Sequence, residues 1–241
     1  MALPMANAPR YKLTIPSTGK SVTYRPFLIK EEKALLIAQQ SEDPETMITT
    51  LKSVIESCII DPIKSSDLAI FDIEYIFTQL RSKSVGEIVT LILKCDTCED
   101  AKASVSYDID LTKLKVNIPE EHSKTIPLFG DVGVVMKYPS LDLLKKLENL
   151  DGNDTDAVFA IITSCIDSVY DSDQMFSAKD HKPEEIRQFV DNLTQEQFIK
   201  LQNFFVTMPK LEHKLNYKCP VCAKEHDKVC LLYTSDAADD T

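Results

Sequence analysis

Apolar and polar residues alternate over two short stretches near the start of the chain. Residues 11–15 and 21–24 both show this period of two, with Pro16 and Gly19 between them. Such alternation is typical of a half-buried strand, and Pro and Gly favour the turn that joins two strands. The pattern therefore predicts a β-hairpin over residues 11–24.

Helical spacing follows this hairpin. Leu35 and Leu36 lie one to two helical turns after the apolar residues 27–29, which predicts a helix that begins around Lys30. A second helix is expected with Asp43 as its N-cap and proline at its first position. Its expected buried residues are Met47, Leu51, Val54, Ile55 and Cys58.

Further helices and strands are predicted along the rest of the chain. Ser66 and Asp67 are expected to cap a third helix, which ends in a basic last turn at Arg81 and Lys83. The predicted strands that follow are residues 86–94, 103–109 and 114–118 and a hairpin over 125–138. Helical stripes then begin at Pro139, and one of them comprises Val158, Ile161, Ile162, Cys165, Ile166 and Val169. The predicted helices that follow are residues 183–193 and a segment from Thr194 to Met208, which opens with a sequence resembling a capping box.

These elements predict an α+β fold in three parts. Residues 8–139 would form an N-terminal domain with a hairpin, helices and an antiparallel β region. Residues 140–210 would form an inserted helical subdomain, and residues 211–230 would return to the β region. Residues 231–241 lack any structural pattern, and we expect them to be an artefactual tail similar to translated adapter sequence.

Composition excludes several classes of function. The formal net charge of −11 argues against a surface that follows nucleic-acid phosphates, which is built from clustered Lys and Arg. No apolar run reaches the length of a membrane span. The N-terminus does not resemble a signal peptide, so the seven cysteines indicate a reducing compartment, in which CxxC pairs bind metal more often than they form disulfides.

Two CxxC knuckles carry the clearest chemistry. Cys95 and Cys98 follow one strand-like run, and Cys219 and Cys222 follow another. Two thiolates three positions apart can bind one ion from a tight turn, and four thiolates make a tetrahedral site that suits Zn²⁺. We therefore expect one structural zinc ion per chain in a clasp similar to a zinc ribbon. Four thiolates leave no position for a substrate, so this ion would stabilise the fold rather than catalyse a reaction.

Other interpretations of the cysteines stay open. The knuckles could be two unrelated surface turns with free thiols, whereas a redox pair is disfavoured because no thioredoxin-like βαβ pattern surrounds either of them. His226 or Cys230 could replace one of the four expected ligands. Cys58 and Cys165 fall on apolar helical stripes and are expected in the core.

The sequence offers no catalytic arrangement. His122, His181 and His213 stand in polar or turn contexts, and no nucleophile pattern lies near them. The segment from Gly130 to Gly133 lacks the lysine and the following helix of a phosphate-binding loop. We therefore predict that the protein is not an enzyme and takes no small-molecule substrate.

Two segments resemble a known family. Residues 24–36 (YRPFLIKEEKALL) and 72–87 (DIEYIFTQLRSKSVGE) are similar to the baseplate hub proteins of T4-like contractile-tailed bacteriophages, and the paired CxxC fits the longer members. The resemblance covers roughly residues 8–230. It implies a non-enzymatic role in building the hub, with other hub proteins as partners. It also implies a location in the tail baseplate of the virion, after assembly in the host bacterial cytoplasm.

The first of these segments has two interpretations. In one, Phe27, Leu35 and Leu36 lie in the core and residues 30–33 form a solvated face. In the other, a charged set contacts another hub subunit. The residues of that set are Arg25, Lys30, Glu31, Glu32 and Lys33.

Three roles stay open at this point. The protein could be a permanent virion component or a transient hub assembly factor that is absent from the mature virion. In another class, it could be a zinc-ribbon adaptor that binds nucleic acid or a polymerase. The acidic neighbours of the first knuckle, Asp96, Glu99 and Asp100, and the lack of an aromatic cluster for base stacking disfavour the adaptor.

Overall fold

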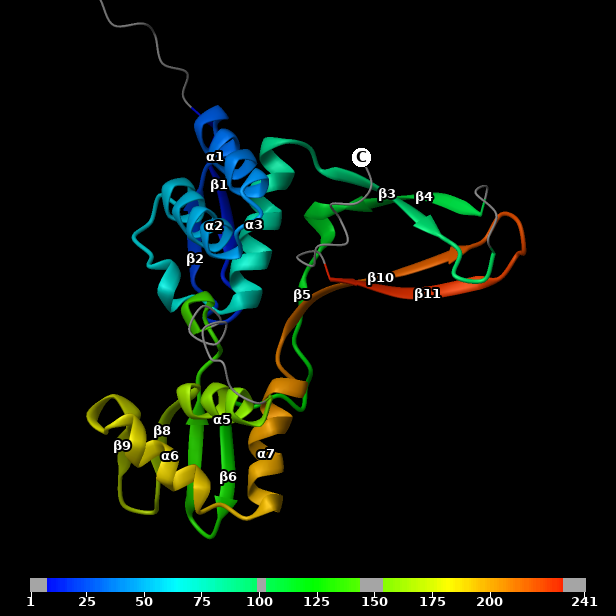
Figure 1. Cartoon of the computed structure of the whole chain (residues 1–241). Helices are drawn as coiled ribbons and strands as arrows, with labels where there is room; N and C mark the ends of the chain where they lie inside the picture. Colours follow the sequence, from blue (N-terminus) through cyan, green and yellow to red (C-terminus); the bar gives the residue numbers. More distant parts are fainter. Residues whose placement is uncertain (1–7, 99–102, 144–153, 232–241) are drawn as a thin grey trace, which may run out of the picture. The chain divides into compact units, whose positions relative to one another are not determined.

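The computed structural model of the chain describes residues 8–98, 103–143 and 154–231, which fall into two units (Figure 1). The first unit combines the N-terminal residues up to Ser65 with Phe71–Asn117 and the segment from Lys210 onward. The second unit combines Ser66–Ile70 with Ile118–Pro209. Helices are mixed with antiparallel sheets, which confirms that part of the predicted fold class. The predicted tail lies outside the described residues from 232 onward.

The first unit opens with the predicted hairpin. Strands β1 (Tyr11–Thr14) and β2 (Ser21–Tyr24) pair antiparallel. Gly19 closes the turn with a φ of 68°, a left-handed conformation that glycine adopts without steric cost, and its N–H donates to the carbonyl of Ile15 at 2.8 Å. The alternation of residue types thus identified this hairpin correctly.

Three helices follow: α1 (Ile29–Gln40), α2 (Pro44–Cys58) and α3 (Ile70–Ser84). The predicted N-cap of α2 is confirmed, because the Asp43 carboxylate accepts the Thr46 N–H at 2.9 Å. Helix α3 starts later than predicted, because residues Ser65–Asp67 form a short 3₁₀ turn instead of the expected cap. The buried residues of α2 are Ile48, Leu51, Val54, Ile55 and Cys58, so Ile48 takes the place that was predicted for Met47.

Side chains and backbone groups of these helices hold the hairpin and the segment after it. The fully buried Asp72 of α3 accepts the Ser17 N–H at 2.9 Å. Ser84 Oγ accepts the Phe27 N–H at 2.9 Å at the other end of α3. Cys58 is a buried core thiol, as predicted, and its burial raises its pKa to about 11. The two hydrogen bonds fix the hairpin turn and the segment before α1 relative to α3.

Helix α1 contradicts the predicted division between core and solvated face. Leu36, which was expected in the core, is 53% exposed, and Glu31, which was expected in solvent, is only 5% exposed. The reason is an ion pair between Glu31 and Arg25, which lets a carboxylate lie inside while an aliphatic side chain lies outside. Phe27 and Leu35 are only half-buried.

Two antiparallel pairs make the β region of the first unit. Strand β3 (Ile88–Lys94) pairs with β4 (Ser104–Asp110), and β10 (Lys210–Lys218) pairs with β11 (Glu225–Leu231) and with the short β5 (Val116–Asn117). Half-buried residues of β3 pack on the buried cluster between these strands. That cluster comprises Ile109, Leu111, Leu114, Leu211 and Leu215. The β region thus has its own apolar core.

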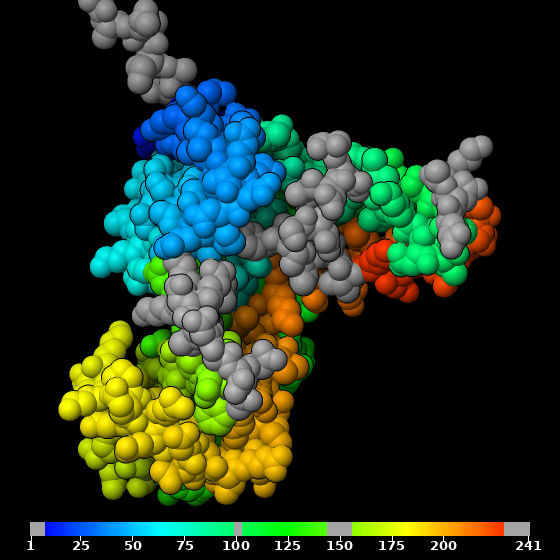
Figure 2. All heavy atoms as spheres, viewed as in Figure 1, coloured from blue at the N-terminus to red at the C-terminus, as the bar shows by residue number. Residues whose placement is uncertain are grey.

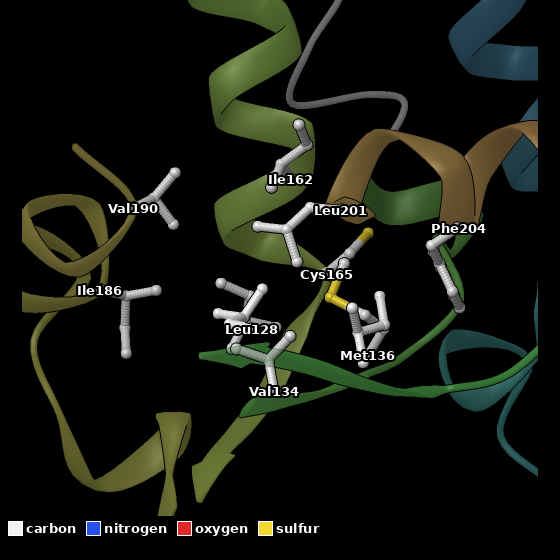
Figure 3. Close-up of a cluster of buried hydrophobic side chains, with 11 residues drawn as sticks. Leu128, Val134, Met136, Ile162, Cys165, Ile186, Val190, Leu201 and Phe204 are labelled. Carbon is white, nitrogen blue, oxygen red and sulfur yellow. The ribbon is translucent and has the colours of Figure 1, made fainter. Parts of the chain in front are cut away.

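The second unit is built around a four-stranded antiparallel sheet in the order β6-β7-β8-β9 (Thr125–Phe129, Val132–Met136, Ile166–Tyr170, Met175–Ser177). Its helices are α5 (Asp154–Ser164), α6 (Pro183–Asp191) and α7 (Gln195–Val206). The side chains between helices and sheet form a continuous apolar cluster (Figure 3). This cluster includes Val134, Met136, Ile162, Cys165, Ile186, Val190, Leu201 and Phe204.

The second unit therefore differs from the helical subdomain predicted for residues 140–210. The hairpin at residues 125–136, which was assigned to the N-terminal domain, belongs to the same sheet as β8 and β9. The helical stripe predicted over residues 158–169 is wrong at its end, because Ile166 begins a strand that pairs with β7. Cys165 is a buried core thiol, as expected.

Candidate metal centre

The first knuckle follows the end of the β3–β4 ladder. The Cys95 N–H donates to the carbonyl of Ala103 at 2.9 Å, which continues the antiparallel pairing by one residue pair. The Thr97 N–H then points back to Cys95 Sγ at 3.4 Å. The chain turns tightly at this point, so Cys95 and Cys98 present their sulfurs from one short loop.

The second knuckle repeats this arrangement between β10 and β11. The Cys219 N–H donates to the carbonyl of Lys224 at 2.9 Å, and the Ala223 N–H donates to the carbonyl of Cys219 at 3.0 Å. Ala223 has a φ of 58°, a left-handed conformation that is uncommon for alanine. This tight turn presents the sulfurs of Cys219 and Cys222 from one short loop.

The structure brings all four predicted sulfur ligands together. Their Sγ atoms lie within 4.8 Å of one another, with 3.8 Å between Cys95 and Cys222 and 3.9 Å between Cys98 and Cys219. A disulfide would need a distance of about 2.05 Å, so these are separate thiols. Four sulfurs about 2.3 Å from a central zinc define a tetrahedron with edges of about 3.8 Å. The sulfur spacing therefore fits a tetrahedral metal ion.

The thiols of this cluster differ in acidity. The Thr97 N–H lowers the pKa of Cys95 to about 5 because it stabilises the thiolate. The pKa of Cys98 is raised to about 12. The main cause is hydrogen bonding with the Cys222 sulfur, and burial is the second cause. Four neighbouring sulfurs cannot all carry negative charge without a cation among them. A divalent ion would supply the missing positive charge, and the four cysteines could hold one.

Residues from β11 and its preceding turn support the first knuckle from outside the cluster. His226 Nε2 lies 3.2 Å from Cys95 Sγ, and its ring stacks on Tyr217. Lys228 pairs with Asp96 at 2.8 Å, and Lys224 Nζ donates to Thr97 Oγ1 at 3.2 Å. His226 is not one of the four mutually close ligand atoms. The side chain of Cys230, the other alternative ligand, lies outside the described residues.

The support by Lys224 and Lys228 was missed from the sequence, although a signal for it exists. Lys224, His226 and Lys228 occupy every second position, and β11, which begins at Glu225, places His226 and Lys228 on one face. That face meets the first knuckle only because the two hairpins lie together, which spacing alone does not reveal.

The chain matches one known protein family over most of its length. The sequence profile described as T4 bacteriophage base plate protein matches residues 8–233, which is nearly the whole chain. The chain belongs to this T4 base plate family. Membership supports a structural role in the phage baseplate, contacts with other phage structural proteins and a place in the virion tail.

Neither the curated proteins nor the solved structures that were compared contain a match to this chain. Among the described residues, no helix combines the length and the apolarity that crossing a bilayer requires.

The charged set predicted to contact partners lies at and just before the start of α1. Arg25 and Glu31 are paired at 2.9 Å, and Lys30 Nζ lies 3.4 Å from the same Glu31 oxygen. Glu32 is half-buried, and Lys33 is exposed. Three members of the set therefore form one ion cluster at the start of α1, of which only Lys30 is open to solvent.

Proposed function

We propose that this protein is a non-enzymatic structural component of the baseplate hub, which it builds through contacts with other hub proteins. The match of the base plate family over residues 8–233 carries this proposal. The resemblance of residues 24–36 and 72–87 to hub proteins supports the hub as the location within the baseplate.

We propose further that Cys95, Cys98, Cys219 and Cys222 hold one structural Zn²⁺ ion. The sulfur spacing and the tight turns that present the sulfurs support this ion. When bound, it would neutralise the thiolates and join the β3–β4 and β10–β11 hairpins. The chain's own residues hold the knuckles in place through backbone hydrogen bonds and the Lys228–Asp96 pair.

Quantitative mass spectrometry of purified tails and of isolated baseplate intermediates tests the hub role. We expect the protein in both preparations, at a fixed ratio to the other baseplate proteins. Presence in intermediates alone would make it a transient assembly factor. Absence from both would refute the hub role.

The alternative role as a zinc-ribbon adaptor for nucleic acid or a polymerase has weaker support. The Lys228 ammonium forms an ion pair with Asp96, and Lys224 donates a hydrogen bond to Thr97. Both lysines therefore contact residues of the first knuckle. A purified chain that binds DNA or RNA with an affinity falling steeply with salt would favour the adaptor.

A further inference from the structure

The outward face of α1 carries large aliphatic side chains. Ile29 is 77% exposed, Leu36 53% and Ile37 56%. Positions separated by seven and eight residues lie on the same side of a helix, so these three side chains form one stripe. The opposite side holds the two buried residues of α1, Glu31 and Ala38. Helix α1 thus places a charge inside and aliphatic groups outside, the reverse of an ordinary surface helix.

An internal ion pair maintains this orientation. Glu31 accepts hydrogen bonds from Arg25 at 2.9 Å and from the Leu28 N–H at 2.8 Å. Burial opposes the charged form of Glu31, but these bonds outweigh it and lower the pKa of the carboxyl group. A rotation of α1 that buried Ile29 and Leu36 would break both bonds. The exposed stripe is therefore built into the fold.

A positive charge lies within the stripe. Lys33 is exposed and stands one helical turn from both Ile29 and Ile37. Within the described part of the chain, Lys33 has no ion-pair partner, in contrast to Lys30, which lies beside Glu31. A two-fold pairing of α1 with its own copy about this centre would bring two Lys33 ammonium groups together. The charge thus disfavours self-association and favours a partner that supplies a carboxylate.

We infer that this face of α1, formed by Ile29, Lys33, Leu36 and Ile37, docks onto an apolar segment of another tail protein that places an Asp or Glu opposite Lys33. The inference rests on the proposed hub function, since it names the surface by which the protein contacts its partner. Three aliphatic side chains around one charge match a helix that lies in an apolar groove. The segment that contains α1 contributes to the surface visible in Figure 2.

Pairwise binding of the purified full-length chain to each baseplate protein of the same phage tests the inference. The variants are Ile37→Asp and Lys33→Glu, and the matched control is Val206→Asp, an aliphatic residue that is 70% exposed at the end of α7. We expect Ile37→Asp to weaken binding by about 30-fold or more, as for a central interface residue, while the control binds as the wild type does. Lys33→Glu should weaken binding at least tenfold and regain it when the facing partner carboxylate is changed to Lys. All three substituted side chains are exposed, so circular dichroism should show unchanged folding.

Photo-crosslinking from benzoylphenylalanine at position 36 identifies the occupant. Crosslinks to an acidic, apolar segment of a tail protein support the inference. Crosslinks between two copies of this chain would overturn it in favour of self-association. Sedimentation with phosphatidylglycerol vesicles that Ile37→Asp abolishes would overturn it in favour of a lipid surface.

The two proposals fail in different ways. A wild-type chain that binds no baseplate protein refutes the hub function and the docking face together. A wild-type chain that binds, with Ile37→Asp binding equally well, refutes only the docking face.

Discussion

Cys98 and Cys219 are 121 positions apart in the sequence, yet their sulfur atoms lie 3.9 Å apart in the structure. The contact exists only when the β3–β4 and β10–β11 hairpins are both folded and packed together. An ion that binds all four sulfurs therefore binds the folded chain and not the unfolded one, and it stabilises the fold by mass action.

Loss of one sulfur ligand should release the metal and destabilise the fold. We expect the wild-type protein to contain about one zinc per chain, and Cys219→Ser to lose it together with several kcal/mol of stability, because metal binding is coupled to folding. Elemental analysis and thermal unfolding measure the two effects. Val221→Ser is the matched control, since Val221 is an exposed residue of the same knuckle without a sulfur. A metal-free wild type of equal stability would contradict the zinc proposal.

Removal of the buried carboxylate of α1 should destabilise the first unit. Glu31→Ala leaves Arg25 without its partner and the Leu28 N–H without its acceptor, so we expect a loss of about 3 kcal/mol in the free energy of unfolding. Urea unfolding measures it. Glu32→Ala removes the same charge one position away and should change stability by less than about 0.5 kcal/mol. Equal effects of the two changes would show that the ion pair does not orient α1.

Glu74 should make stability depend on pH. Burial of this α3 residue raises its pKa from 4.5 to about 7. Its contribution to stability is therefore full below pH 4.5, where the carboxyl group is neutral in both states, and is lost as the pH rises through about 7. Glu74→Gln should raise stability by about 3 kcal/mol at pH 8 and change it little at pH 4.5. Thermal unfolding at both pH values measures this, with exposed Glu196→Gln as the control. A gain for Glu74→Gln that is the same at both pH values would rule out titration as its cause.

Gly133 should not tolerate a side chain. A Cβ atom at this position would lie 2.2 Å from the hydroxyl oxygen of Tyr170, which pairs with it across β7 and β8, and 2.6 Å from the carbonyl oxygen of Ile126. We expect Gly133→Ala to cost about 2–3 kcal/mol, as for an overpacked core. Chemical denaturation measures the cost. Adding Tyr170→Ala should recover part of it, and a cost that does not change would exclude the Tyr170 contact as its source.

Features set by neighbouring residues were predictable from the sequence. The first hairpin follows from alternation and a Pro/Gly turn, and α2 follows from Asp43 and the proline after it. Each CxxC pair presents its sulfurs from one tight turn, so its geometry is also local. These elements were predictable because each signal lies within a few neighbouring residues.

Features set by distant contacts were not predictable. Residues 158–169 fit a helical stripe throughout, but Ile166 pairs with Met136 and begins strand β8. The strand forms here because β7 lies beside it, which the spacing of apolar residues does not reveal. Likewise, Glu31 is buried because Arg25 lies where it can pair with the carboxylate. A polar position in a helix indicates solvent only when no such partner exists.

The order of synthesis determines when the sulfur cluster can form. Cys95 and Cys98 leave the ribosome well before Cys219, 121 residues after Cys98, has been added. At elongation rates of about 5–20 residues per second, this gap lasts roughly 6–24 s. During that interval Cys95 and Cys98 lack the sulfurs of Cys219 and Cys222, so a metal ion can bind to the two thiols or an oxidant can react with them. The nascent protein thus carries two of the four ligands, and the site is complete only after the β10–β11 hairpin has been synthesised.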